Sequence, residues 1–302
     1  MDKIEDLKKI GDYDVINVLG EGGFGMVFLV EKNKVQYALK VYTRKGISYM
    51  NHEYNISNVI TPITKTSTSS MCPPSIACSV DKGSFIFNNT EQYYLVMEYV
   101  DGYSLEEYFR LTYVVFKNIS EKCLAKFAYH ILKGIDFLHS HGVAHNDIKP
   151  DNIIFNQSQL KLIDLGFGCV LDNKKYVNPL SCSTSAFSGT VYYISPELYE
   201  LYYHKIEYDK EIFIKNDIWC FGLTLAELCD YDSYSQKLGE RVYDYKYENG
   251  YFPYIPETKK GKKIPLILRK MIKECLNFDY KKRPTAKKLL ERLEKNYPYL
   301  KK

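Results

Sequence analysis

Hydrophobic and polar positions divide the chain into two blocks with different periods. Between residues 13 and 100, short apolar runs rich in β-branched and aromatic residues are bounded by turn residues, which is typical of strands. The strands predicted in this way are 14–20, 26–31, 36–42, 84–87 and 93–99. One predicted helix, 47–59, interrupts them, and the segment 61–75, rich in Thr, Ser and Pro, is predicted to be a loop.

The second block is mainly helical. In the segment 121–141, apolar residues recur at the three- and four-residue spacing of an amphipathic helix, from Leu124 to Leu138. Ser120, directly before it, is a suitable N-cap. The segments 212–229, 265–277 and 285–294 are also predicted to be helical. A small β-rich lobe followed by a larger helical lobe places the chain in the α+β class.

Composition excludes several classes of protein. The chain has 302 residues, of which 45% are hydrophobic and 26% are charged, so it is neither a disordered chain nor a coiled coil. The net charge of +4 gives no reason to expect nucleic acid as the main partner. The 29 tyrosines are best explained by the codon bias of an AT-rich genome.

The first residues are charged and the apolar runs are short. Neither a secretory signal nor a membrane helix of ~20 apolar residues is therefore expected. We expect a protein of the cell interior, which would be the host cytoplasm if the source is a virus. The 8 cysteines have no metal-ligand spacing, so free thiols are predicted.

A glycine-rich segment, residues 20–25, separates the first two predicted strands. Glycines let backbone N–H groups approach a phosphate closely, although the same pattern also occurs in plain hairpin turns. No helix follows it, which argues against the dinucleotide-binding fingerprint. Lys40 lies in the third strand, where an edge lysine could simply extend outward. Its spacing from the glycines favours a phosphate-binding role instead.

Two polar clusters follow the glycine segment and Lys40. Asp147 and Asn152 lie five residues apart with Lys149 between them, directly after the long predicted helix. Asp164, followed by Leu-Gly, comes after the apolar segment 160–163. Each feature alone is compatible with an ordinary turn, but their order along the chain is not expected by chance.

At these positions the sequence resembles the eukaryotic protein kinase superfamily, over residues 13–293. The segments 20–27 and 145–152 match the phosphate loop and the catalytic loop, Lys40 matches the strand-three lysine, and Asp164 begins a D-F-G motif with Leu for Phe. Residues 195–197 match A-P-E, residues 217–222 match D-x-W-x-x-G, and Arg283 matches the arginine that pairs with the A-P-E glutamate.

The resemblance implies a two-lobed protein-kinase-like fold. A small β-rich N-lobe with one main helix would span about 13–100, and a larger, mainly helical C-lobe about 101–297. Residues 1–12 would form a short N-terminal extension.

The resemblance also implies individual roles in phosphoryl transfer from ATP with Mg²⁺. Asp147 would accept the substrate hydroxyl proton, and Lys149 would steady the γ-phosphate. Lys40 would hold the α- and β-phosphates and pair with Glu53, the only acidic residue between Lys40 and Asp81. The metal ligands would be Asn152 and Asp164. The other ATP-contacting positions would be Leu19, Gly20, Glu21, Gly22, Gly23, Phe24, Gly25, Val27, Ala38, Met97 (the gatekeeper), Glu98, Tyr99, Val100 (the hinge) and Ile154.

A lysine two residues after the catalytic Asp is typical of serine/threonine kinases, and Thr190 resembles the loop threonine that contacts both. We expect an ATP-dependent serine/threonine protein kinase, a monomer that acts on protein substrates, with no nucleic acid or membrane partner. A pseudokinase would have lost Lys40, Asp147 or Asp164. A small-molecule phosphotransferase would normally lack A-P-E and D-x-W-x-x-G. Dual specificity stays open.

Two positions depart from the family pattern. Asn146 replaces the arginine that helps to receive a loop phosphate, and a neutral amide cannot form that bidentate charge pair. Activity is therefore predicted not to need phosphorylation read by residue 146. The hydroxyl-rich segment 181–188 offers autophosphorylation sites, but a loop is equally often rich in serine for no regulatory reason. Ser57 replaces a large apolar residue, so either Ile56 or Val59 substitutes, or the helix is docked loosely and needs an activating partner.

Overall fold

The computed structural model describes residues 3–22, 25–61, 72–116, 119–156, 160–171, 190, 193–205, 209–229, 258–259 and 262–301. They form two compact units. The first comprises Met1–Asp101 and Ile163–Gly166, and the second comprises Gly102–Leu162 and Phe167–Lys302. The short segment Ile163–Gly166 thus belongs to the N-terminal unit although it comes much later in the sequence.

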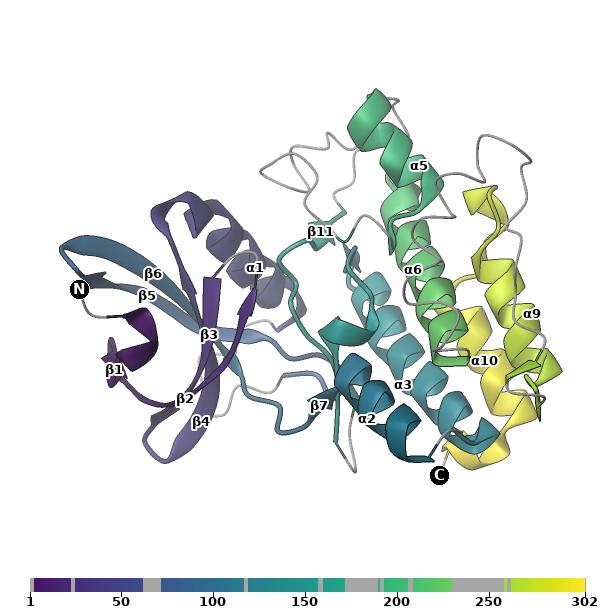
Figure 1. Cartoon of the computed structure of the whole chain (residues 1–302). Helices are drawn as coiled ribbons and strands as arrows, with labels where there is room; N and C mark the ends of the chain where they lie inside the picture. Colours follow the sequence, from purple (N-terminus) through teal and green to yellow (C-terminus); the bar gives the residue numbers. More distant parts are fainter. Residues whose placement is uncertain are drawn as a thin grey trace. The chain divides into compact units, whose positions relative to one another are not determined.

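A six-stranded antiparallel sheet, in the order β1-β2-β3-β4-β6-β5, forms the N-terminal unit (Figure 1). Two of its hairpins turn on Asn33-Lys34 and Asn88-Asn89, all with left-handed backbone, a conformation that asparagine tolerates better than most residues. The strands are β1 (Lys9–Ile10), β2 (Tyr13–Gly22), β3 (Gly25–Lys32), β4 (Val35–Tyr42), β5 (Ser79–Phe87) and β6 (Thr90–Glu98).

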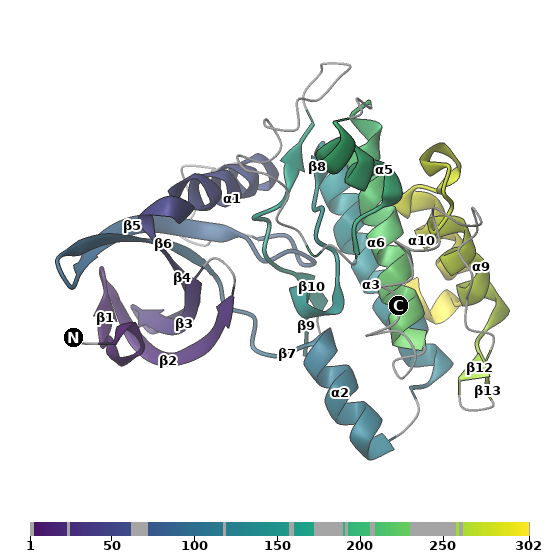
Figure 2. The ribbon, with the colours of Figure 1, turned by 45° about the horizontal axis from the view of Figure 1, so that its top comes forward.

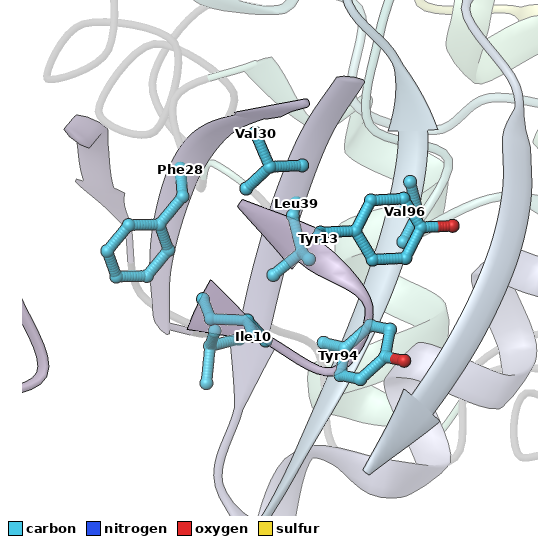
Figure 3. Close-up of a cluster of buried hydrophobic side chains, with 8 residues drawn as sticks. Ile10, Tyr13, Phe28, Val30, Leu39, Tyr94 and Val96 are labelled. Carbon is cyan, nitrogen blue, oxygen red and sulfur yellow. The ribbon is translucent and has the colours of Figure 1, made fainter. Parts of the chain in front are cut away.

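One face of this sheet carries a hydrophobic cluster of its own. The side chains come from alternate positions of the strands, as the two-residue period of a strand requires. Ile10 of β1 is fully buried in it, and Ile4 and Leu7 pack against its edge, so residues 3–10 form part of this core. The labelled members in Figure 3 are Ile10, Tyr13, Phe28, Val30, Leu39, Tyr94 and Val96.

The opposite face packs against α1 (Ile47–Ile60), the main helix of this unit. Tyr42 and Leu95 from the sheet and Met50 from the helix form the buried centre of the contact. Helix α1 lies along β5 (Figure 2). The sheet face that bears Lys40 is therefore the face that meets the helix.

Helix α6 (Glu211–Cys229) is the centre of the second unit. Almost all of its residues are buried, which is typical of a helix surrounded by protein. It contacts α3 (Glu121–Ser140) and α9 (Leu266–Cys275), while α10 (Ala286–Asn296) packs on α3 (Figure 1). Two further helices are α2 (Leu105–Phe116) and α5 (Pro196–Tyr199), the latter continued by the helical turns Glu200–His204.

Short strands complete the second unit and position its loops. Strands β7 (Tyr103–Ser104), β9 (Ile153–Phe155) and β10 (Leu160–Leu162) form a three-stranded sheet. Strand β8 (Val143–Ala144) pairs with β11 (Cys169–Val170), and β12 (Thr258–Lys259) pairs with β13 (Lys262–Lys263). The segment between β8 and β9 is thus held at both ends.

The α+β prediction is confirmed, and the predicted helices and strands are present with shifted ends. Ser120 caps α3 as predicted, because its side chain accepts a hydrogen bond from the Cys123 N–H at 3.2 Å. The helices α2 and α5 and the short strands β1, β7, β8, β9, β11, β12 and β13 were not predicted individually.

The prediction that all cysteines are free thiols is wrong. Cys72 and Cys78 form a disulfide with their Cα atoms 5.8 Å apart, and Cys169 is disulfide-bonded as well. The fold brings the first two together because the chain turns just before β5, a contact that their spacing of six residues does not reveal. Cys123, Cys220, Cys229 and Cys275 are not disulfide-bonded.

Within the described residues, none of the helices combines the length and the apolar character that crossing a bilayer requires.

Candidate active site

The glycine-rich segment closes the hairpin between β2 and β3, where Gly22 pairs with Gly25. Gly25 has a φ of 142°, and a Cβ there would lie 1.9 Å from the carbonyl oxygen of Val41, so only glycine fits. At Gly20, an added Cβ would meet no described atom within 4 Å, so packing does not explain that glycine. Gly23 and Phe24 lie outside the described residues.

Several predicted nucleotide-contacting residues share the sheet face that bears Lys40. In the strand register, Val27 is opposite Lys40, and Ala38 is opposite Met97. Directly opposed residues, and those two positions apart, point to the same face of a sheet. Val27, Ala38, Lys40 and Met97 are therefore brought together, although they come from three strands.

Five other predicted nucleotide contacts are exposed or partly buried. Leu19 is 43% exposed near the end of β2. Glu98 ends β6, and its N–H donates to the Cys78 carbonyl at 3.1 Å. Tyr99 and Val100 follow it and are partly exposed, while Ile154 lies in β9 of the second unit.

Three charged side chains of the N-terminal unit meet beside this face. The Lys40 ammonium lies 3.2 Å from the Asp164 carboxylate and 3.9 Å from that of Glu53. Lys40 and Glu53 are both buried, at 6% and 2% exposure. The pair predicted by elimination is therefore formed, but the direct ion pair of Lys40 is with Asp164.

Burial raises the pKa of Glu53 to about 7. The positive charge of Lys40 and hydrogen bonds from Tyr42 and the Leu165 backbone oppose this rise in the pKa, while the negative charge of Asp164 adds to it. The Tyr42 hydroxyl donates to Glu53 Oε2 at 2.9 Å, a contact that the sequence did not indicate.

Asp164 and Gly166 form a tight turn. Asp164 has a left-handed backbone with a φ of 61°, and its Oδ1 accepts the Gly166 N–H at 3.1 Å. A Cβ on Gly166 would lie 2.9 Å from that same oxygen, so the glycine lets the turn close around the carboxylate. Its other oxygen, Oδ2, is the one that faces Lys40.

In the second unit, a compact set of hydrogen bonds surrounds Asp147, which is 3% exposed. Its Oδ2 lies 3.1 Å from the Lys149 ammonium and accepts from Asn152 Nδ2 at 2.6 Å. Its Oδ1 accepts the Thr190 N–H at 3.4 Å, and the Thr190 hydroxyl accepts a short hydrogen bond from Lys149. The four residues therefore form one polar group.

Helix α6 holds the backbone of this loop through Asp217, which is fully buried. Its carboxylate accepts the N–H groups of His145 at 2.8 Å and Asn146 at 2.7 Å. It also accepts a hydrogen bond from the ring of His139 at 2.9 Å. Asp147 thus follows two residues whose backbone is attached to a buried helix.

The side chain of Asn146 forms hydrogen bonds within the second unit. Its backbone is left-handed, with a φ of 63°, which suits asparagine better than most residues. Its amide donates to the Phe167 carbonyl at 3.3 Å and accepts from Asn216 at 3.4 Å. The hydroxyls of Ser181, Ser183, Thr184, Ser185 and Ser188 lie outside the described residues.

The predicted pairing of Arg283 with Glu197 is confirmed. The guanidinium donates to both carboxylate oxygens, at 2.5 Å and 2.8 Å. Arg283 also donates to the carbonyls of Asn277 and Lys215, and it stacks 4.8 Å from the Trp219 ring centre.

Ser57 attaches α1 to the sheet. It is fully buried, and its hydroxyl accepts the Ser79 N–H of β5 at 3.0 Å. Ile56 is buried, whereas Val59 is 41% exposed, so of these two only Ile56 can replace the missing apolar contact.

The residues expected to bind metal have the donor atoms that Mg²⁺ prefers. Asp164 supplies a carboxylate and Asn152 an amide oxygen, both hard oxygen ligands. Within the described residues, both side-chain hydrogen bonds of Asn152 use its amide nitrogen, so its amide oxygen can serve as a ligand. The donor set therefore fits the ion.

Comparison with known proteins identifies the class. The model of the protein kinase domain matches residues 13–293. The chain is 26% identical to MAP kinase kinase MKK1/SSP32 of Saccharomyces cerevisiae over 95% of its own length and 53% of that protein. It is 26% identical to serine/threonine-protein kinase PKH2 of the same yeast over 94% of its length and 25% of that protein.

A third relative, serine/threonine-protein kinase STE20 of Debaryomyces hansenii, is 31% identical over 65% of this chain and 16% of that protein. The chain thus spans about half or less of these relatives. Because the family model covers most of its residues, the chain belongs to the protein kinase family.

Proposed function

We propose that this chain is an active, ATP-dependent serine/threonine protein kinase. The observation that carries the proposal is the polar group around Asp147, in which Lys149, Asn152 and Thr190 all contact one buried carboxylate or each other. A scaffold without catalysis has no need to keep this group together with Lys40 and Asp164.

The proposed roles follow from the chemistry of phosphoryl transfer, in which positioning and charge neutralisation supply most of the catalysis. Asp147 accepts the proton of the substrate hydroxyl, and Lys149 steadies the phosphoryl group in transfer. Lys40 holds the α- and β-phosphates. Asp164 and Asn152 would hold Mg²⁺, which would neutralise charge on the phosphate oxygens.

The nucleotide would lie against the sheet face that carries Val27, Ala38 and Met97. The open space at Gly20 supports this, since a side chain there would occupy room that a ligand can use. Leu19, Glu21, Gly22, Gly23, Phe24 and Gly25 would cover it, Glu98, Tyr99 and Val100 would form the hinge, and Ile154 would contact the adenine.

Specificity for serine and threonine is proposed from the contact between Lys149 and Thr190. The relatives named as serine/threonine kinases support it. The substrates would be proteins. The expected activating partner, the monomeric state and the location in the cell interior stay predictions.

The test is phosphate transfer from labelled ATP, with Mg²⁺, to a generic basic protein, followed by identification of the phosphorylated amino acid. Asp147→Asn should lower the rate on the order of 10²–10⁴-fold, because it removes the proton acceptor but keeps the shape. The matched control is Asp136→Asn, which changes a half-buried carboxylate on α3 and should keep the activity. Transfer that survives Asp147→Asn, or that labels tyrosine alone, would contradict the proposal.

A further inference from the structure

Tyr42 lies on the same sheet face as Lys40, two positions further along β4. The intervening Val41 points to the opposite face, where it joins the other hydrophobic cluster. The Tyr42 ring is 1% exposed and packs with Met50 of α1 and Leu95 of β6. Its position is thus fixed by both the sheet and the helix.

The hydroxyl of Tyr42 lies closer to the buried Glu53 carboxylate than the Lys40 ammonium does. It donates to Glu53 Oε2 at 2.9 Å, while the Lys40 ammonium is 3.9 Å from that same oxygen. The Lys40 ammonium also lies 5.2 Å from the centre of the Tyr42 ring. Lys40 itself is closer to Asp164, at 3.2 Å.

Tyr42 and Lys40 are thus two of the groups that bind this carboxylate, beside the Leu165 backbone N–H. Lys40 has two carboxylates within reach and would also have to meet phosphate oxygens, so it cannot by itself fix Glu53 in one place. A hydrogen bond from a neutral, buried hydroxyl to a carboxylate is strong in a low-dielectric site, and it is geometrically specific. Gly46 makes room for the Tyr42 ring in this position, because a Cβ at residue 46 would lie 3.0 Å from the ring.

We propose that Tyr42 is a positioning residue for the Lys40–Glu53 pair. Its hydroxyl holds the Glu53 carboxylate beside Lys40 while Lys40 turns to Asp164 or to the nucleotide. Helix α1, which carries Glu53, is thereby kept against β4 whether or not the ion pair is closed. The role rests on the proposed kinase function, because its purpose is to orient Lys40 toward phosphate.

The test is a double-mutant cycle between Tyr42→Phe and Glu53→Ala. Phenylalanine keeps the ring and its packing but removes the hydroxyl. In the otherwise unchanged protein, Tyr42→Phe should lower kcat/KM for ATP about tenfold, a typical cost of losing a hydrogen bond to a charged group. In the Glu53→Ala background the same change should cost less than about twofold, because no carboxylate remains to be positioned.

Two further measurements separate positioning from folding. Binding of a non-hydrolysable ATP analogue, measured by calorimetry, should weaken in Tyr42→Phe. Thermal unfolding without nucleotide should show the same coupling between residues 42 and 53. The matched control is Tyr93→Phe. Tyr93 lies at the edge of the same cluster, and the hydroxyl that this change removes bonds to Glu91 at the surface. It should leave all three measurements unchanged.

The outcomes are distinct. An active protein in which Tyr42→Phe behaves like Tyr93→Phe, or costs the same with and without Glu53, would overturn the positioning role alone. A wild-type chain that binds nucleotide in no assay and transfers no phosphate would overturn the proposed function, and with it the purpose given to Tyr42, even if residues 42 and 53 are coupled in unfolding.

Discussion

Two buried ion pairs, one in each unit, differ in the distance between their charged groups. In the second unit, Arg283 donates two hydrogen bonds to Glu197, at 2.5 Å and 2.8 Å, and two more to the carbonyls of Asn277 and Lys215. In the N-terminal unit, the Lys40 ammonium remains 3.9 Å from Glu53 and is shared with Asp164. Both pairs are almost fully buried, so exposure to water does not explain the difference.

The difference fits the role proposed for Lys40. Arg283 donates to a buried carboxylate and to two carbonyls at once, which its planar guanidinium allows. Under the proposed function Lys40 would have to be available for a ligand, and a flexible ammonium with several alternative acceptors would suit that task. A closed buried pair holds the helical unit together, whereas an incompletely closed one can exchange partners.

Breaking the closed pair should have the largest effect on stability. Arg283→Met leaves the Glu197 carboxylate buried without its cation, which should cost about 3–5 kcal/mol. Lys40→Met should cost much less, because burial already raises the pKa of Glu53 and the carboxyl can take up a proton once the cation is gone. Chemical denaturation of the two variants checks this.

The matched control for that prediction is Lys282→Met, which changes an exposed neighbour in the sequence. It should shift stability by less than about 0.5 kcal/mol. Equal losses in Arg283→Met and Lys40→Met would remove the distinction between the two pairs.

A third buried carboxylate, Glu227 on α6, sharpens the comparison because its hydrogen-bond partner is the neutral hydroxyl of Tyr193. Burial raises the pKa of Glu227 from 4.5 to about 7; the hydrogen bond opposes this rise, and nearby Glu106 and Asp151 add to it. Between these two pH values the folded state binds more protons than the unfolded state. The contribution of Glu227 to stability is therefore fully present below pH 4.5 and is lost as the pH rises through 7.

Glu227→Gln should remove this pH dependence, which amounts to at most roughly 3 kcal/mol across the window. The measurement is denaturant unfolding at several pH values between 4.5 and 8, compared between the wild type and Glu227→Gln. Glu53 titrates in both proteins, so the difference between the two curves isolates residue 227. Parallel curves would mean that Glu227 is not protonated in the folded protein.

The Arg283–Glu197 pair could be predicted from the sequence, but the contacts of the Lys40–Glu53 pair could be predicted only in part. Arg283 and Glu197 lie within recognisable motifs, and Glu53 was found because no other acidic residue was available nearby. Alternation along 36–42 places residues 40 and 42 on one face, but it does not say that a hydroxyl reaches Glu53. That contact depends on how α1 is rotated on the sheet, and the apolar residues of 47–59 do not fix this rotation.

The same limit applies to the disulfide and to Ser57. A spacing of six residues between Cys72 and Cys78 is compatible with many loop conformations, and only the fold brings them together. Ser57 looked like a weakness because the family has an apolar residue there. Its hydroxyl in fact accepts a buried backbone N–H, which a helical pattern of apolar residues cannot reveal.

The smallest predicted effect concerns the attachment of α1 to the sheet through Ser57. The position of Glu53 beside Lys40 depends on it. Ser57→Ala leaves the Ser79 N–H without its acceptor in a buried position, which should lower the stability by about 1–2 kcal/mol. Lys82, which donates to Asn51 of α1 at 2.5 Å, still links the helix to β5, so the helix should loosen rather than detach. Because α1 carries Glu53, the KM for ATP should rise by a few fold as well. Ser48→Ala, an exposed position in the first turn of α1, is the control, and equal effects of the two changes on stability and KM would show that Ser57 does not hold the helix.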